Sequence, residues 1–284
     1  MTEIRYIFTV TAGRSGQSSL ANLIKRHVPG CYPAFEEPRI KRYFPGVLGD
    51  LESRFRRNFI ETNELLGRGK VLKAYESANH EFLENIAAKR VRIAQKQLLE
   101  NQDHIYFDVS KFFARGLHCG FASILPTFSL VRLVRDPLFN MRSFLNRGKN
   151  FMLDNSLPSS RKNILRLSCD EMVNGELYLW AWCEMYLRYD WLINNFNISH
   201  HVEIRTEDLS NPEKMDKSLD LLGLKHGEIT TSKRFNTNFE QGHGPTLIGK
   251  PDIEIFYRFI DRLPKDILNR LKYFDTYNPE ENIY

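Results

Sequence analysis

The sequence lacks the features that mark several classes of protein. Its 284 residues include only four cysteines, and no two of them form a C-x-x-C pair. Scattered cysteines argue against a disulfide framework or a cysteine-ligated zinc site and are typical of a reducing compartment. No apolar run reaches the length of a membrane-spanning helix, and the N-terminal apolar run ends too early for a signal peptide. We therefore expect a soluble, cytoplasmic protein.

A large excess of charge of one sign is also missing. The chain has 40 Lys and Arg against 35 Asp and Glu, a formal net charge of +5. This balance is too weak to predict a nucleic-acid partner, but it suits a site for small anions. The cationic run of Arg54, Arg56 and Arg57, with Lys41 and Arg42, is expected to be solvated surface, and contact with an acidic acceptor is the alternative. Without repeats, low-complexity tracts or a clear linker, residues 1–284 are expected to form one domain.

Short apolar runs alternate with segments of helical spacing along the chain. The expected strands lie at 4–10, 70–77, 104–110, 128–136 and 201–209. The expected helices lie at 18–28, 80–100, 171–196, 211–223 and 252–273. Another helix is expected to begin at Pro137 with Asp136 as its cap. Strands that alternate with helices predict an α/β fold with a central parallel sheet and helices on both faces.

The segment "VTAGRSGQSS" (10–19) is built like a phosphate-binding loop without that loop's lysine. An ATP-binding pattern G-x-x-x-x-G-K-[ST] aligned on Gly16 requires glycine at 11 and lysine at 17, where the chain has Thr11 and Gln17. The strand before the loop and the helix after it remain, so backbone amides are expected to face an anion at a helix N-terminus. Further donors expected there are Arg14, Ser15, Ser18 and Ser19. The alternative is a plain strand–turn–helix corner with a surface arginine.

A second segment, "RDPLFNMRS" (135–143), predicts another anion site. Arg135 stands at the carboxyl end of a strand, and Ser143 follows eight residues later, slightly more than two helical turns. Ligands of open α/β sheets bind outside the carboxyl ends of the strands. An anion held by Arg135 and Ser143 is therefore expected on the same edge as the first loop. A capped helix start with a solvated arginine is the alternative.

Together the two segments resemble the sulfotransferases that use 3′-phosphoadenosine-5′-phosphosulfate (PAPS), in their carbohydrate-directed, Golgi-type or bacterial branch. In that family a K/R-S-G-[ST]-[ST] loop binds the 5′-phosphosulfate, and an R-D-P…S segment binds the 3′-phosphate. Residues 14–19 match the first pattern except at Gln17, and Arg135 and Ser143 match the second. The segments 106–117 and 204–209 are similar to the family's strand before the 3′-phosphate segment and to its R-Y-E-D-L segment.

The resemblance implies a P-loop-like sulfotransferase fold and transfer of a sulfuryl group from PAPS to an acceptor hydroxyl, without a metal. Such a donor has no γ-phosphate, so the lysine of an ATP loop has no obligatory task. Arg14 is given an electrostatic role beside the bridging oxygen that leaves. The implied PAPS-binding residues are Arg14, Ser15, Gly16, Gln17, Ser18, Ser19, Arg135 and Ser143.

The catalytic base is expected in "FEEP" (35–38). Several carbohydrate-directed members carry Glu-Pro after the second strand, with the glutamate as base, and Glu37-Pro38 matches that pattern. Glu36, His80 and His118 are the alternatives, and a further alternative is that both glutamates are ordinary surface charges. On this match, the acceptor is expected to be a carbohydrate or glycolipid, followed by a small-molecule alcohol or phenol.

Two other functions remain open from the sequence. A divergent nucleotide kinase or NTPase of the same loop class would require ATP and magnesium, and the missing lysine argues against it. A non-catalytic nucleotide-binding protein would keep the loop without a working base. The acceptor pocket is expected to draw on the loops at 38–70 and 145–170, and Arg234 and Lys250 are candidates for a loop that closes over the donor.

Overall fold

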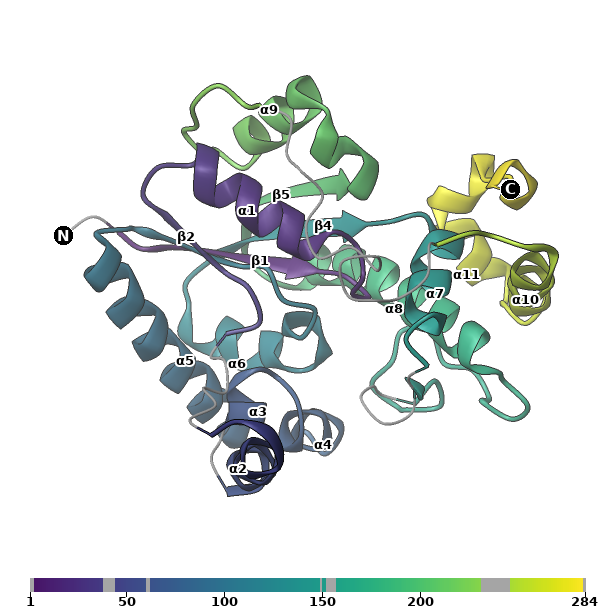
Figure 1. Ribbon diagram of the computed structural model, residues 1–284, viewed down its shortest axis with the longest axis horizontal. Helices are drawn as coiled ribbons and strands as arrows, with labels where there is room; N and C mark the ends of the chain where they lie inside the picture. Colours follow the sequence, from purple (N-terminus) through teal and green to yellow (C-terminus); the bar gives the residue numbers. More distant parts are fainter. Residues whose placement is uncertain are drawn as a thin grey trace.

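The centre of the protein is a parallel β-sheet (Figure 1). The structure is a computed structural model, and it describes residues 3–37, 44–59, 62–148, 150–151, 157–230 and 246–282. The described strands are β1 (Arg5–Val10), β2 (Cys31–Ala34), β3 (Ile105–Asp108), β4 (Phe128–Val134) and β5 (Ile198–Arg205). Their order is β2-β3-β1-β4-β5, and every neighbouring pair is parallel.

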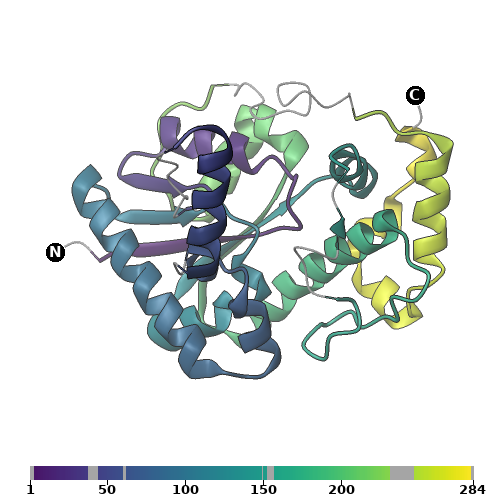
Figure 2. The ribbon, with the colours of Figure 1, turned by 60° about the horizontal axis from the view of Figure 1, so that its bottom comes forward.

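Helices cover both faces of the sheet (Figures 1 and 2). One face carries α1 (Gln17–His27) and α9 (Pro212–Leu221). The other face carries α5 (His80–Asn101), α6 (Leu117–Ile124) and α8 (Asn174–Asn195). The predicted α/β class, with a central parallel sheet and helices on both faces, is confirmed. No helix in the described part of the chain has the length and hydropathy of a membrane span.

The remaining helices pack around the ends of these layers. Near α5 and α6 lie α2 (Gly46–Phe59), α3 (Thr62–Leu65) and α4 (Lys70–Glu76). Against or beyond α8 lie α7 (Pro137–Leu145), α10 (Lys250–Ile260) and α11 (Lys265–Arg270). As predicted, Pro137 begins α7, and the Asp136 side chain caps it by accepting a hydrogen bond from Phe139 N at 3.0 Å.

The central strand β1 is buried on both sides. Ile7 packs in the core beneath α1 and α9, whereas its neighbour Phe8 packs in the core on the opposite face. The Phe8 ring stacks on Phe113, with 4.1 Å between the ring centroids. Successive strand residues point to opposite faces, so a sheet covered on both faces requires the continuous apolar run that the sequence has here.

Two predicted elements are wrong, both for local reasons. The segment 70–77, predicted as a strand, forms the helix α4, in which Val71 and Ala74 are the buried residues. Their spacing of three is helical, but a run this short does not distinguish a strand from a helix. The single helix predicted at 252–273 is interrupted, because α11 starts anew after Pro264, and proline disfavours a helix interior. The helices α2, α3 and α6 have no counterpart in the sequence prediction.

His118 on α6 is a core residue. It is fully buried, and its ring contacts those of Tyr75, Trp191 and Phe196 at centroid distances of 5.2, 5.9 and 6.0 Å. Burial, and after it the positive charge of Arg188, lowers the pKa of His118 to about 3. The imidazole is therefore neutral at physiological pH and enclosed by other side chains, which does not suit the alternative role of a catalytic base.

This buried imidazole predicts a pH-dependent stability. In the unfolded chain, His118 takes up a proton near its ordinary pKa of 6.5. In the folded protein its pKa is about 3, so it takes up the proton only at much lower pH. The contribution of His118 to the free energy of unfolding is therefore fully present above pH 6.5. It is lost on acidification, by up to about 1.4 kcal/mol per pH unit. Urea unfolding of His118→Phe between pH 7 and pH 4 should show a shallower fall in the free energy of unfolding than the wild type. His80→Gln, at an exposed position, is the control, and an unchanged slope in His118→Phe would contradict the assignment.

Candidate functional site

The candidate site lies where β1 and β4 end. These strands are neighbours in the sheet. The helix that follows β1 covers one face of the sheet, whereas the chain that follows β4 continues to α7 and α8 on the other side (Figure 1). In open α/β sheets, ligands bind outside the carboxyl ends of the strands at such a point of divergence. The topology therefore directs attention to the segment between β1 and α1.

This segment turns sharply through three residues with positive φ: Gly13 at 98°, Arg14 at 57° and Gly16 at 79°. A Cβ on Gly13 would lie 2.9 Å from Lys111 Cδ, and one on Gly16 would lie 2.9 Å from Leu209 Cδ1. Both the dihedrals and the close packing favour glycine. Arg14 is the unusual residue, because a non-glycine residue with positive φ is uncommon and marks positions held by their surroundings.

The turn leads directly into the N-terminus of α1. Gly16 is the N-cap and makes no side-chain capping hydrogen bond, and the first turn contains no acidic residue. Lys25, Arg26 and His27 occupy the last turn, where cations complement the helix dipole. The N-terminus of a helix carries N–H groups and partial positive charge, which together favour a bound anion.

The Ser15 hydroxyl is a hub of hydrogen bonds inside the loop. Its Oγ accepts from Asn140 Nδ2 at 2.7 Å and from Thr11 Oγ1 at 3.0 Å, and it donates to Gly13 O at 3.1 Å. Tyr178 OH on α8 also donates to Gly13 O, at 2.8 Å. The single proton of this hydroxyl is thus used within the loop, so the Ser15 side chain supports the loop.

The segment 106–117 supports the loop from the β3 side. Gln17 Nε2 donates to Val109 O at 3.3 Å, and Arg115 Nη2 donates to Ala12 O at 3.2 Å. The Gln17 side chain is buried and therefore fastens the start of α1 to the end of β3.

The segment 204–209 supports the loop from the other side. Thr206 Oγ1 lies 3.0 Å from Ser15 O and 3.1 Å from Val134 O. One hydroxyl thus joins the loop after β1 to the end of β4. All four sequence segments that carry the family resemblance therefore meet at this loop.

Arg14, Arg135 and Ser143 come together as neighbours. Arg14 Nε donates to Ser143 Oγ at 3.3 Å, and Arg135 Nη1 donates to Arg14 O at 3.2 Å. The backbone of Arg135 is held in turn by Trp182 Nε1, which donates to Arg135 O at 2.9 Å. Two segments more than a hundred residues apart thus form one cationic region.

The charged side chains of this cationic region shift one another's pKa values. Burial, then Arg147 and Arg135, lowers the pKa of Arg14 to about 10, although Tyr178 and Glu36 act in the opposite direction. Arg14 remains cationic at neutral pH. Burial also lowers the pKa of Arg147, and no described residue accepts a hydrogen bond from its shielded Nε and Nη2 atoms. A bound anion would relieve this repulsion and satisfy such donors, so the residues fit an anionic ligand.

Glu37 follows the end of β2 and is held by two donors. Its Oε2 accepts from Tyr32 OH at 2.7 Å and from Gln97 Nε2 at 2.9 Å. Pro38 lies outside the described residues. The neighbouring Glu36 is exposed and has a φ of 49°, and its charge raises the pKa of both Arg14 and Arg147. The two glutamates thus have different surroundings, Glu37 toward α5 and Glu36 within electrostatic range of the arginines.

Sequence reasoning missed several residues that shape the site. Asn140 lies three residues before Ser143 on α7, and this spacing, which places two side chains on one helix face, was an available signal. Tyr178 belongs to an aromatic-rich helix, where nothing in the spacing separates it from its neighbours in the core. Arg115 lies within the matched segment 106–117 but at no position that its pattern specifies, and Arg147 lies outside the matched segments, so only the folded chain brings them to the loop.

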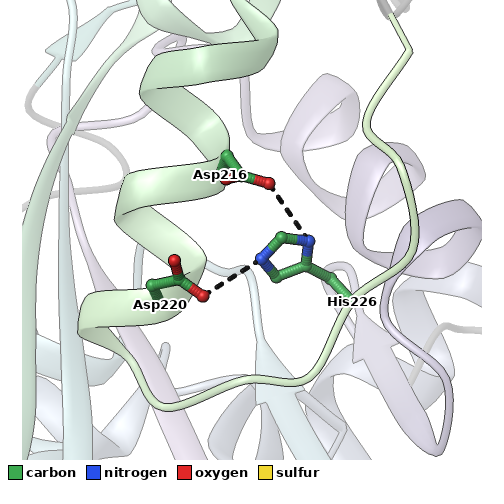
Figure 3. Close-up of side chains that lie close together, drawn as sticks. All are labelled: Asp216, Asp220 and His226. Carbon is green, nitrogen blue, oxygen red and sulfur yellow. Dashed lines mark hydrogen bonds and ion pairs between the residues drawn. The ribbon is translucent and has the colours of Figure 1, made fainter.

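A group of metal-ligating side chains occurs at the surface of α9 (Figure 3). His226 Nδ1 lies 3.5 Å from Asp216 Oδ1, and His226 Nε2 lies 3.3 Å from Asp220 Oδ1. The two carboxylates therefore face different ring nitrogens. A metal ion binds one nitrogen of an imidazole, whereas the two carboxylates lie beside different nitrogens, and exposed acidic groups are common without an ion. We assign no metal there.

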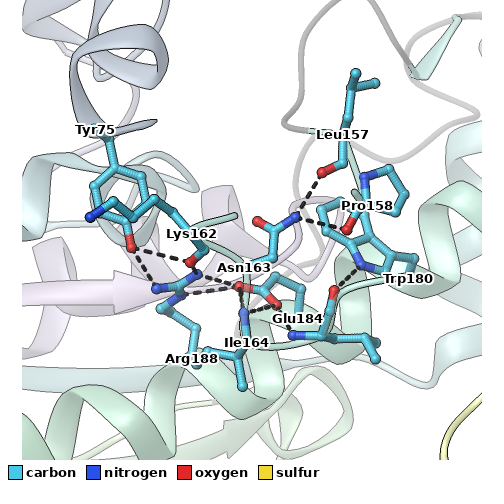
Figure 4. A network of polar contacts seen from close by, with 10 residues as sticks. Tyr75, Leu157, Pro158, Lys162, Asn163, Ile164, Trp180, Glu184 and Arg188 are labelled. Carbon is cyan, nitrogen blue, oxygen red and sulfur yellow. Dashed lines mark hydrogen bonds and ion pairs between the residues drawn. The ribbon is translucent and has the colours of Figure 1, made fainter. Parts of the chain in front are cut away.

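A buried charge network anchors the loop that precedes α8 (Figure 4). Glu184 accepts hydrogen bonds from Ile164 N at 3.0 Å and from Leu165 N at 2.8 Å. Arg188 pairs with Glu184 and donates to Lys162 O at 2.7 Å. Part of the segment expected to supply acceptor contacts is therefore fixed to α8 by hydrogen bonds.

Comparison with known proteins bears on the fold. No protein-family model and no curated protein matches the sequence. Among solved structures, the chain is similar to the sulfotransferase domain from the Synechococcus PCC 7002 olefin synthase, with a TM-score of 0.51 and 16% identity. The likeness covers 98% of this chain and 96% of that one. The chain therefore has the fold of a sulfotransferase domain over nearly all its length.

The Ser15 hub gives a stability prediction. Ser15→Ala leaves the buried donors of Asn140 and Thr11 without their acceptor, so we expect the free energy of unfolding to fall by about 1–3 kcal/mol. Ser18→Ala is the control because Ser18 is only half-buried, and it should cost less. Urea denaturation measures both. Equal stabilities for the two variants would show that the Ser15 side chain does not support the loop.

Proposed function

We propose that the protein is a PAPS-dependent sulfotransferase that moves a sulfuryl group to an acceptor hydroxyl. The observation that carries this proposal is the contact of Arg14 with Ser143 and of Arg135 with the Arg14 carbonyl. It joins the phosphate-type loop after β1 to the helix start after β4 in one cationic region. The sulfotransferase-domain fold supports the same activity.

The donor is a nucleotide with anionic groups at its 5′ and 3′ positions, and the proposal gives each group its own partners. The backbone amides of residues 15–19 and the Arg14 guanidinium bind the 5′-phosphosulfate. Arg135 and Ser143 bind the 3′-phosphate. The Gln17 side chain is used in its bond to Val109 O, so its contribution to the donor is its backbone N–H. The fixed guanidinium charges supply the neutralisation that a metal supplies in ATP loops.

The reaction is an in-line displacement at sulfur. The acceptor oxygen forms a bond to the sulfur, while the bond from sulfur to the bridging oxygen breaks and 3′,5′-ADP leaves. Negative charge grows on the bridging oxygen, and Arg14 stabilises it without donating a proton, because a guanidinium keeps its proton at ordinary pH.

Glu37 serves as the base that takes the proton of the attacking hydroxyl. Tyr32 and Gln97 both donate to Oε2, which fixes the carboxylate and directs the proton to its other oxygen. The proposed acceptor is a carbohydrate or glycolipid, and a small-molecule alcohol comes next.

Donor recognition is tested by calorimetry with 3′,5′-ADP. We expect binding that requires the 3′-phosphate, is unaffected by magnesium, and is much weaker for AMP and for ATP with magnesium. Loss of a charged hydrogen bond in Arg135→Ala should weaken binding about 10- to 100-fold. Arg166→Ala, at an exposed position, should bind like the wild type. Preference for ATP with magnesium, or full affinity in Arg135→Ala, would rule out this donor site.

The base is tested by Glu37→Gln, which keeps the shape of the side chain but cannot accept the proton. We expect turnover to fall by about 10²- to 10⁴-fold, while 3′,5′-ADP binds nearly as tightly as to the wild type. Turnover is measured as 3′,5′-ADP released from PAPS with a panel of carbohydrate and alcohol acceptors. Glu36→Gln is the matched control. If Glu36→Gln loses turnover and Glu37→Gln keeps it, the base is Glu36.

A further inference from the structure

Arg147 follows the end of α7, and two of its donors have no acceptor among the described residues. Its Nε and Nη2 atoms are shielded from solvent, and neither donates a hydrogen bond to a described residue. Arg142, on the same helix, is compensated, since its Nη1 lies 3.5 Å from Asp252 Oδ1. Buried donors without partners are rare in native proteins because each costs free energy. The shielded edge of Arg147 is thus suited to an acceptor that a ligand supplies.

The chemistry of this edge indicates the kind of ligand. In a guanidinium group, the hydrogens of Nε and Nη2 on this edge point the same way, so the pair fits two oxygens of one carboxylate, sulfate or phosphate group. The side chain as a whole is half-buried, and its several rotatable bonds allow the edge to turn toward a ligand. The two donors therefore predict a bound oxoanion.

Packing holds this end of α7 close to the loop after β1. Arg147 stands four residues beyond Ser143, which is about one helical turn and a rise of about 6 Å along a helix. Between them, the Phe144 ring stacks on the Tyr178 ring, with 4.5 Å between the centroids. The Tyr178 hydroxyl in turn donates to Gly13 O at 2.8 Å. Arg147 is thus fixed near the donor site but one turn past the residue that contacts Arg14.

Electrostatic neighbours connect Arg147 both to the donor site and to the segment of the proposed base. Burial lowers the pKa of Arg147, and the charge of Glu36 raises it. Burial, and after it the charge of Arg147, lowers the pKa of Arg14. Glu36 directly precedes the proposed base Glu37. The acceptor hydroxyl must lie between the sulfur beside Arg14 and that base, so substituents next to the hydroxyl come within range of Arg147.

The proposed donor does not account for this arginine. Its 5′-phosphosulfate is assigned to Arg14 and the loop amides, and its 3′-phosphate is assigned to Arg135 and Ser143. Each anionic group of the donor already has a cation beside it. Arg147 thus provides a further positive charge, on the side where the acceptor must enter.

We propose that Arg147 is a specificity-determining residue that binds an anionic group of the acceptor through Nε and Nη2. The acceptor is then a hydroxyl compound that carries a carboxylate or a sulfate ester near the hydroxyl that receives the sulfuryl group, as an acidic saccharide does. The inference rests on the proposed function, because it requires the donor site beside Arg147.

The test is calorimetry on the full chain saturated with 3′,5′-ADP. The titrants are a tetrasaccharide of alternating glucuronic acid and N-acetylglucosamine, the same tetrasaccharide with its carboxylates reduced to alcohols, and the reduced form carrying sulfate esters. We expect at least one charged form to bind about tenfold or more tightly than the uncharged form, and the comparison of the two charged forms identifies the anionic group.

The preference should depend on Arg147. Loss of a charged hydrogen bond in Arg147→Met should remove about a factor of ten or more from the preference for the charged form. Arg147→Lys should keep part of it, since lysine retains the charge but not the planar fork. Arg166→Met, at an exposed position, is the matched control and should keep the whole preference.

Nucleotide binding separates this inference from the proposed function. Arg147→Met should bind 3′,5′-ADP and PAPS as tightly as the wild type and keep its circular-dichroism spectrum. Wild-type protein that does not bind 3′,5′-ADP would overturn the proposed function and this inference with it. Normal 3′,5′-ADP binding without a preference for either charged saccharide overturns this inference alone. So does a loss of 3′,5′-ADP or PAPS affinity in Arg147→Met, since Arg147 would then bind the donor.

Discussion

The geometry of the candidate site depends on one buried hydroxyl group. Ser15 Oγ joins Thr11 at the end of β1, Gly13 in the turn and Asn140 on α7. Because Thr11 and Gly13 belong to the turn and Asn140 belongs to α7, the hydroxyl fixes the path of the turn relative to the helix after β4. The approach of Arg14 to Ser143 depends on that path. A loop whose shape is held by buried neighbours can present its amides without help from a ligand.

The positive charge of this loop is thus distributed differently from that of an ATP-binding loop. In an ATP loop, one lysine extends from the start of the helix. Here the positive charge comes from Arg14 within the turn and from Arg135 and Arg147 on the far side, and Gln17 takes a supporting role at the position of the lysine. The charges come from two chain segments, so the loop sequence alone underestimates how cationic the site is.

The sequence was most informative where a function or an element depends on local spacing. It predicted the parallel sheet, the Asp136 cap and the nearness of the Arg14 loop to Ser143. Each of these follows from the spacing of residues along the chain or from the topology of a parallel sheet. It did not predict the role of Tyr178, or the contact of Gln97 with Glu37 across sixty residues, because such contacts are set by packing between distant elements. The α4 error has a local origin, since a run this short does not distinguish a strand from a helix.

The left-handed backbone of Arg14 means that two requirements act on this position. The residue must carry a positive charge, and it must adopt a positive φ. Glycine would satisfy the backbone and lose the cation, whereas lysine would keep a cation and lose the planar fork, with the same strained φ of 57°. No single replacement preserves both properties. We therefore expect this position to tolerate less change than its half-buried side chain suggests.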